Sequence, residues 1–216
     1  SRSMRQYRRA RRQDEKQDRI DGILLAARKR LDQLSIQQCN LHDIAADVGI
    51  TKAALYRYFR AKELIFIEIY RQELQETCDD LRDTLLEGVA FDALTLGNVL
   101  ARHPCFCALL TQLSGSLLPV LQPAEREALQ QFERSCWLTV LCALQARFTL
   151  TALTAEQLIH HWLVTIAGCG ALSADALPAV AEYDHAAPPS LALRLADQCA
   201  PWFSRLEVDG QRASKG

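Results

Sequence analysis

Apolar residues recur every three or four positions along most of the chain, which is the spacing of one face of an α-helix. The clearest stripe follows Lys62, and its members are Leu64, Ile67, Tyr70, Leu74, Cys78, Leu81 and Leu85. We find no alternation of apolar and polar residues long enough to indicate a strand. The sequence therefore predicts an all-α protein of about nine helices.

Breaks between the stripes fall at glycine, proline and capping residues. We predict N-caps at Asn40 (with Asp43 as its capping-box partner), Thr51 and Thr154, Pro123 in the first turn of a long helix, and a kink at Pro201. The segment 177–189 is predicted to be a loop. The predicted helices cover 18–34, 41–47, 52–59, a long segment from 62, 91–102, 105–118, 124–148, 155–172 and 190–206.

Charge is distributed unevenly along the chain. Residues 1–62 contain 15 Lys and Arg against 7 Asp and Glu, a balance of +8. Residues 63–216 contain 10 against 19, a balance of −9, so the net charge is only −1. A basic N-terminal region on an acidic remainder indicates that a polyanion contacts one end of the molecule.

The segment from Asn40 to Lys62 predicts a helix-turn-helix. A tight break at Val48-Gly49-Ile50 separates two short helices, and Ala45 is small where they must approach. Short side chains at the start of the second helix allow close approach to base edges, while its longer side chains donate to phosphates. The inner side is predicted to hold Ile44, Val48, Ile50 and Leu55, and the exposed side Lys52, Ala53, Tyr56, Arg57 and Tyr58.

Residues Ile44–Leu64 resemble the signature of the TetR family of bacterial transcriptional regulators. The resemblance implies that Lys62 binds a phosphate at the start of its helix. Two positions depart from the pattern, since Ser35 replaces a glycine before the second helix and Cys39 replaces a threonine beside the cap. The implied DNA contacts are Asn40, His42, Thr51, Lys52, Ala53, Ala54, Tyr56, Arg57, Tyr58 and Lys62.

The resemblance also implies an organisation. We expect a basic flexible arm (1–16), a three-helix helix-turn-helix domain (17–63), a larger helical effector-binding and dimerisation domain (64–208) and a flexible tail (209–216). The implied protein is a cytoplasmic homodimer that binds double-stranded operator DNA, without cofactor, metal, membrane or enzymatic activity. It would be a repressor, released from the operator by a small, largely apolar or aromatic effector.

The effector pocket and the dimer interface follow from the same resemblance and from the helical pattern. The candidate pocket residues are Leu110, Thr111, Leu113, Phe132, Cys136, Trp137, Val140, His161 and Trp162. The candidate dimer residues are Ala167, Gly168, Gly170, Ala171, Leu191, Leu195, Trp202 and Phe203.

Two alternatives stay open. His103, Cys105 and Cys107 could make a thiol- or metal-responsive regulator, although zinc needs a fourth ligand and helical residues two apart face different ways. The eight cysteines contain no CxxC pair and fit a reducing compartment better than a disulfide framework. A helical enzyme or carrier is the other alternative, and the chain lacks a GxSxG, an HExxH and a glycine-rich phosphate loop.

Overall fold

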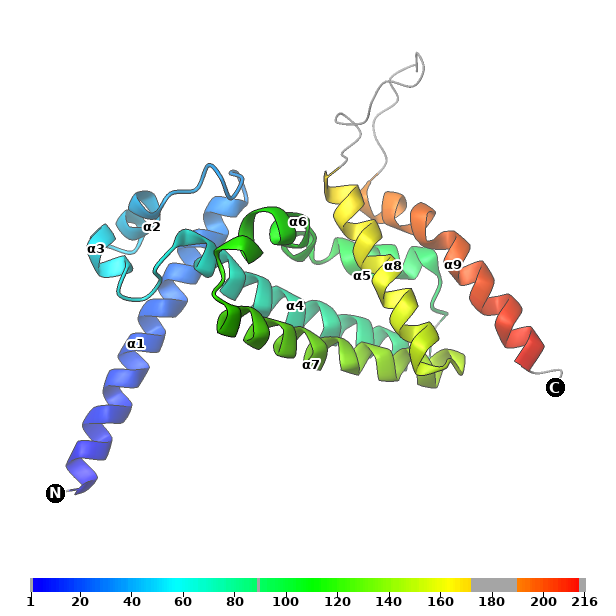
Figure 1. Cartoon of the computed structure of the whole chain (residues 1–216), viewed down its shortest axis with the longest axis horizontal. Helices are drawn as coiled ribbons and strands as arrows, with labels where there is room; N and C mark the ends of the chain where they lie inside the picture. The colour runs from blue at the N-terminus through cyan, green and yellow to red at the C-terminus, as the bar shows by residue number, and fades with distance from the viewer. Residues whose placement is uncertain (1, 89, 172–189, 214–216) are drawn as a thin grey trace, which may run out of the picture. The chain divides into compact units, whose positions relative to one another are not determined.

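The computed structural model describes residues 2–88, 90–171 and 190–213, and every regular element in these ranges is a helix (Figure 1). The predicted all-α class is therefore confirmed, whereas the loop predicted at 177–189 lies outside the described residues. The elements are α1 (Arg2–Leu31), α2 (Leu41–Asp47), α3 (Lys52–Leu55), α4 (Lys62–Leu86), α5 (Ala93–Ala101), α6 (Pro104–Gln112), the π-helical turn η1 (Leu113–Leu117), the 3-10 turn η2 (Leu118–Val120), α7 (Pro123–Phe148), α8 (Ala152–Ala171) and α9 (Leu191–Ala213).

The chain forms two compact units, and each has its own core. The first unit comprises Ser1–Ile69 and Ser116–Leu121, and the second comprises Tyr70–Gly115 and Gln122–Gly216. The boundary lies inside α4 rather than before it, because the first two turns of α4 bury Ile65, Phe66 and Ile69 in the first unit. We expected the helix-turn-helix domain to end at residue 63, whereas the first compact unit extends to Ile69.

Helix α1 differs most from the prediction, since it begins at Arg2 and includes the residues that we expected to form a separate arm. Residues 2–19 are exposed, so no packing holds these turns. They are rich in Arg and Gln, which favour helix, and side-chain pairs four apart add support. Arg11 Nε lies 3.1 Å from Glu15 Oε1, and Gln17 Nε2 donates to Asp21 Oδ1 at 2.9 Å. Helix α9 likewise continues to Ala213, into the expected tail.

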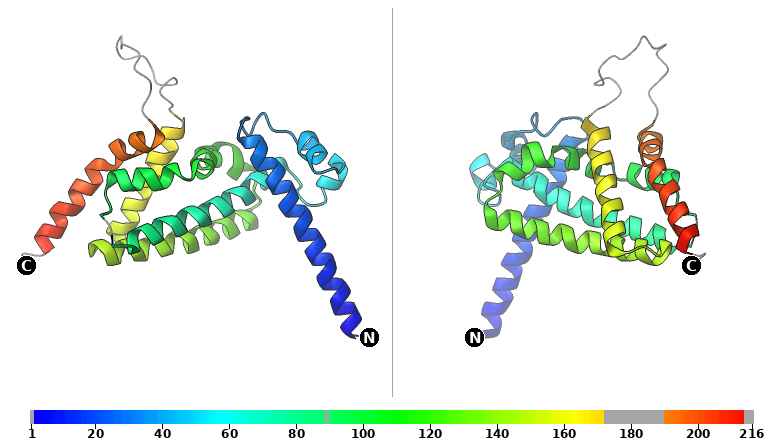
Figure 2. Two further views of the ribbon diagram at one scale, coloured as in Figure 1. Left: turned by 180° about the vertical axis from the view of Figure 1, so that it is seen from behind. Right: turned by 45° about the vertical axis from the view of Figure 1, so that its right-hand side comes forward.

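In the second unit, α4 and α7 run parallel and side by side (Figure 2). Tyr70 Oη donates to Glu133 Oε2 at 2.7 Å near one end, and Arg147 Nη1 donates to the Leu85 carbonyl at 3.3 Å near the other. The remaining helices pack as α5 on α9, α6 on α8, and α8 on both α7 and α9. Phe91 lies at the centre of an aromatic cluster that also contains Phe148, Trp162 and Phe203.

The capping predictions are confirmed at Asn40 and Thr51 and are wrong at Thr154. Helix α8 begins at Ala152, and its cap is Thr151, whose Oγ1 accepts from the Thr154 backbone N–H at 3.2 Å. Two threonines three apart offer the same capping signal, so the pattern alone does not choose between them. Pro123 begins α7 as predicted, with a capping box between Gln122 and Glu125.

Within the described residues, no single helix is long and apolar enough to cross a membrane. Two sharply bent helix pairs meet the length and composition test together, namely Ala93–Ala101 with Pro104–Val120 and Pro123–Phe148 with Ala152–Ala171.

Candidate nucleic-acid interface

Helix α2 is fixed at both ends by local hydrogen bonds. At its start, Asn40 Oδ1 accepts from the Asp43 backbone N–H at 2.8 Å, and Asn40 Nδ2 donates to Asp43 Oδ2 at 2.7 Å. At its end, Gly49 adopts φ of 71°, a left-handed conformation that suits glycine. The Ile50 N–H then donates back to the Ala45 carbonyl at 3.0 Å. The predicted sharp turn between two short helices is present.

Helix α3 is one α-helical turn that continues into further turns, rather than the longer helix that we expected to reach Phe59. Thr51 Oγ1 caps it by accepting from the Ala54 N–H at 3.1 Å. The N–H groups of Tyr58 and Phe59 both donate to the Leu55 carbonyl, at 2.9 and 3.1 Å, so the chain stays tightly wound beyond α3. Leu55 and Phe59 are buried, and these anchors turn the opposite side of the segment toward solvent.

The outward side of α3 carries the residues predicted to contact DNA. Thr51, Lys52, Ala53, Tyr56 and Arg57 are exposed, while Ala54 and Tyr58 are half-buried. Lys52 Nζ lies 5.8 Å from the centre of the Tyr56 ring, so the ammonium and the phenol form one polar patch. Small side chains at the start of the helix with cationic and phenolic donors behind them suit an approach to a groove and its phosphates.

An ion pair that the sequence analysis missed holds α1 against α2. Arg30 Nε and Nη2 each donate to one carboxylate oxygen of Asp47 at 2.8 Å, and Arg30 Nη1 lies 3.7 Å from Asp43 Oδ2. The hydrogen bond from Arg30 lowers the pKa of Asp47 below its usual range. Residues 17 positions apart on different helices leave no periodic signal, and so only the three-dimensional structure shows this pair.

Lys62 lies at the start of α4, where the resemblance implies a phosphate contact. Its ammonium donates to the carbonyls of Ile36 at 3.1 Å and Cys39 at 2.9 Å, with Gln37 at 3.4 Å. A lysine ammonium has three donors, and these three carbonyls match that number. The phosphate contact stays a prediction, and it requires the ammonium to leave the loop.

The loop before α2 is closed despite the two departures from the family pattern. Ser35 Oγ accepts from the Gln38 N–H at 3.2 Å, and Gln38 Oε1 accepts from the Ser35 N–H at 2.9 Å. Cys39 is buried, where a small apolar side chain fits, and burial raises the pKa of its thiol. His42 is exposed beside this loop, whereas Asn40 is engaged as the α2 cap.

The residues predicted to line an effector pocket make contacts within the chain. Thr111 Oγ1 donates to the Cys107 carbonyl at 3.0 Å, and His161 stacks on Trp202 with ring centres 3.5 Å apart. Arg71 covers the Phe132 ring at 4.3 Å. Leu110 is half-buried, and the core contains Leu113, Cys136, Val140 and Trp162.

A surface groove of about 930 Å³ lies instead between α7 and α8. Of the predicted pocket residues it shares only Trp137, which also lies 6.5 Å from the Phe106 ring. The sequence predicts two apolar stripes on α7, but periodicity does not show which stripe faces a neighbouring helix.

The predicted dimer residues are also divided by the structure. Leu195 and Phe203 are buried within the chain, and Gly170 faces Thr111 of α6, so these three serve internal packing. Ala167, Leu191 and Trp202 are half-buried, whereas Gly168 and Ala171 are exposed on α8. Leu153 and Val164 on α8 and Leu193 on α9 are also exposed and were not predicted.

The thiols near His103 do not join it in one cluster. Cys107 is buried with its Sγ 3.7 Å from the Leu100 carbonyl, and burial raises its pKa to about 12. His103 Nε2 lies 2.6 Å from Asp80 Oδ2 instead. A protonated, buried thiol is a poor metal ligand and a poor redox sensor.

Comparison with known proteins places the DNA-binding pattern in a family. Residues 23–69 match the family model for bacterial regulatory proteins of the tetR family. This match includes α2, α3, the turn between them and the start of α4. Among curated proteins, none matches this sequence.

Solved structures resemble most of the chain. A FadR of Thermus thermophilus, a TetR family transcriptional repressor in complex with lauroyl-CoA, is 16% identical, with 88% of this chain and 94% of that chain covered and a TM-score of 0.55. A TetR transcriptional regulator from Rhodococcus sp. RHA1 is also 16% identical, with coverages of 86% and 94% and a TM-score of 0.54. A TetR family regulator from Agrobacterium tumefaciens is 20% identical, with coverages of 88% and 98% and a TM-score of 0.53.

These likenesses show the fold over most of the chain, and the family model identifies the segment with the capped, outward-facing α3. Residues 23–69 therefore match the tetR family of bacterial regulatory proteins, on a chain that has the fold of solved regulators of that family.

Proposed function

We propose that this protein is a sequence-specific DNA-binding repressor that a small, largely apolar effector releases from its operator. The single observation that carries DNA binding is the exposed start of α3, where Thr51, Lys52 and Ala53 project from a rigid turn. Leu55 and Phe59 anchor this turn from behind. A short, anchored helix with an exposed N-terminal turn is the form in which helix-turn-helix proteins present side chains to the major groove.

The residues divide into two roles under this proposal. Lys52 can donate to guanine O6 and N7, and the Ala53 methyl can contact thymine, so these two read bases. Arg57 and Tyr58 lie one turn further along and donate to phosphates, which position the protein without reading sequence.

The test of DNA binding is selection of duplexes from a random library by the full-length protein. We expect enrichment of one sequence with two half-sites about 34–36 Å apart, centre to centre, because a symmetric dimer presents two α3 segments. Lys52→Ala should weaken binding to the selected duplex more than to random duplex, by about 1–3 kcal/mol on the former. Failure to enrich any sequence would contradict the proposal.

A matched control separates base reading from general charge. Arg126→Ala removes one exposed cation from α7, in the second unit. We expect this variant to retain the wild-type preference for the selected duplex. Equal losses on both duplexes for Lys52→Ala would assign Lys52 to phosphate only and leave sequence reading to Ala53, Arg57 or Tyr58.

The aromatic cluster of the second unit supports an apolar effector with one hydrogen-bond acceptor. Trp162 is 1% exposed, and its Nε1 has no hydrogen-bond partner among the described residues. An unsatisfied buried donor costs about 1–3 kcal/mol, which an acceptor on a bound molecule would recover. Phe91 and Phe203, at ring-centre distances of 6.3 and 6.4 Å, supply apolar walls around it.

A repressor of the same fold was solved with lauroyl-CoA, and so long-chain acyl-CoA is the first probe. We expect lauroyl-CoA to raise the melting temperature and to release the selected duplex, whereas coenzyme A alone does neither. Trp162→Phe keeps an aromatic ring and removes the donor, so it should weaken this release; its smaller ring also leaves a cavity, so the stability of the unliganded variant is measured alongside. Trp137→Phe is the control, since Trp137 lies at the surface groove.

A further inference from the structure

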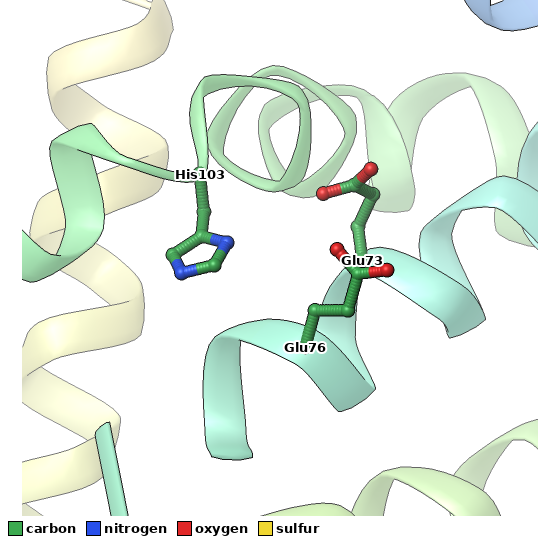
Figure 3. Close-up of side chains that lie close together, drawn as sticks. All are labelled: Glu73, Glu76 and His103. Carbon is green, nitrogen blue, oxygen red and sulfur yellow. The ribbon is translucent and has the colours of Figure 1, made fainter. Parts of the chain in front are cut away.

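We infer that Glu73, Glu76 and His103 form a binding site for a divalent transition-metal ion in the second unit (Figure 3). One ligand atom from each residue can be chosen so that all three lie within 4.8 Å of one another. A single ion binds nitrogen and oxygen ligands at about 2.0–2.2 Å, so its ligand atoms lie at most about 4.4 Å apart, and small side-chain adjustments would bring these three atoms into that range. The inference concerns the second unit and is independent of the proposed DNA-binding function.

Two separate elements bring the ligands together. Glu73 and Glu76 are three residues apart on α4 and therefore project from the same helical face. His103 immediately precedes α6, where the chain has just left α5. In Figure 3, one of the two ring nitrogens of His103 lies on the side of the Glu73 and Glu76 carboxylates. From the sequence, His103 is considered as a metal ligand only in the alternative with Cys105 and Cys107, because the glutamates lie 27 and 30 positions away.

The histidine ring is already held in a ligand's orientation. His103 Nε2 lies 2.6 Å from Asp80 Oδ2, which leaves Nδ1 for the side of the glutamates. Asp80 is itself held by Arg102, whose Nη2 and Nε donate to its two oxygens at 2.8 and 3.1 Å. In many metal sites, the histidine nitrogen that does not bind the metal donates to a carboxylate, which fixes the orientation of the ring.

Electrostatics favour an ion between the two glutamates. Carboxylates at this separation repel each other, and the repulsion grows where water is excluded. Glu73 is only 8% exposed, whereas Glu76 is exposed, so the site has one buried side and one open side. A divalent cation replaces the repulsion by two attractions, and it can enter from the side of Glu76.

The donor set selects the class of metal. One imidazole and two carboxylates favour zinc, manganese or iron(II) over magnesium and calcium, which prefer oxygen ligands alone. Three protein ligands leave at least one coordination position for water. Cys105 and Cys107 are not needed, and the buried Cys107 thiol lies against a backbone carbonyl.

The experiment titrates zinc into full-length protein that has been stripped of metal by a chelator, with calorimetry and thermal unfolding as readouts. We expect one zinc per chain and a higher melting temperature in its presence, because an ion that binds only the folded state stabilises it. Magnesium at the same concentration should give a much smaller shift. Glu76→Gln removes an exposed ligand without disturbing the core, and it should weaken zinc binding at least tenfold while the metal-free melting temperature does not fall.

Two controls decide between this site and its alternatives. Glu127→Gln makes the same change at an exposed position of α7, and Cys105→Ser removes the nearest half-buried thiol; both should bind zinc as the wild type does. Loss of zinc binding in Cys105→Ser would overturn the site in favour of the thiols. Equal affinity of Glu76→Gln and wild type, or absence of any zinc-dependent shift in the wild type, would also overturn it. Operator binding is measured separately, so its failure bears only on the proposed function.

Discussion

Lys62 uses its N–H groups inside its own chain, where they hold the carbonyls of Ile36, Gln37 and Cys39. The charged head group therefore stabilises the loop that leads into α2. Its position at the start of α4 was clear from the sequence, but the carbonyls that it binds lie 23–26 positions earlier in an irregular loop. No periodicity connects a helix start to such a loop, and so the role could not be predicted.

We expect Lys62→Met, which retains the aliphatic stem, to lower the free energy of unfolding by about 1.5–3 kcal/mol, as for hydrogen bonds from a charged group. DNA affinity should fall with stability, while the dependence of affinity on salt stays as in the wild type. Denaturant unfolding and salt titrations check both points. If stability is unchanged and the slope of log affinity against log salt concentration falls by roughly one unit per half-site, Lys62 binds a phosphate instead.

A second prediction concerns the carboxyl group of Glu133 and the pH dependence of stability. Burial raises the pKa of its carboxyl group, against the hydrogen bond from Tyr70, which lowers it. The folded protein therefore keeps this proton to a higher pH than the unfolded chain, and stability falls as pH rises through the window just above the usual glutamate pKa. We expect Glu133→Gln to remove this fall.

Thermal or denaturant unfolding from pH 4 to 8 measures the effect as the difference between the two proteins. The difference also removes the contributions of Asp47, Asp80 and Asp92, whose lowered pKa values act at lower pH. Parallel stability curves for wild type and variant would show that the carboxyl group of Glu133 is not perturbed by folding.

At the scale of elements, α5 and α9 meet at a glycine. A Cβ atom added at Gly97 would overlap the carbonyl oxygen of Ala192 and lie 3.2 Å from the Ala196 nitrogen. The two backbones are thus in direct contact, and Gly170 permits a similar approach between α8 and Thr111 of α6. The apolar stripes predicted which faces of these helices are buried, but a stripe does not identify its partner. That is why Gly170 was assigned to a dimer interface.

We expect Gly97→Ala to destabilise the protein by about 1–3 kcal/mol, because the added methyl group pushes α9 away from α5. The matched control is Gly22→Ala in α1, where no atom lies within 4 Å of the added Cβ. There the substitution should stabilise by about 0.5–1 kcal/mol through helix propensity alone. Denaturant unfolding compares the two, and loss of stability in both variants would remove the packing explanation.

At the scale of the whole molecule, the C-terminal turns of α8 offer a surface to a second chain. Val164 is 72% exposed, and Gly168 and Ala171, on the same helical face, leave room for a close helix neighbour. Leu153 is also exposed, but Glu156, Gln157 and His160 lie between it and Val164 along the helix. The fold class, the helix-turn-helix and most helix bounds could be predicted from periodicity, caps and the family pattern. Contacts between distant residues, such as Arg30 with Asp47 or His103 with Asp80, could not.

We expect the protein to be a homodimer and Val164→Glu to convert it to a monomer at micromolar concentration, since the carboxylate would be buried against a second α8. Sedimentation velocity measures the change. Leu94→Glu, at an exposed apolar position of α5, is the control and should remain dimeric. A wild-type monomer, or dissociation of both variants, would place the interface elsewhere.

Helix α4 belongs to the cores of both compact units, and its sequence from Lys62 to Leu86 contains neither glycine nor proline. An uninterrupted helix of 25 residues is about 37 Å long and does not bend sharply without such a residue. The two cores therefore share one continuous backbone element, so a residue that breaks this helix would disturb both of them.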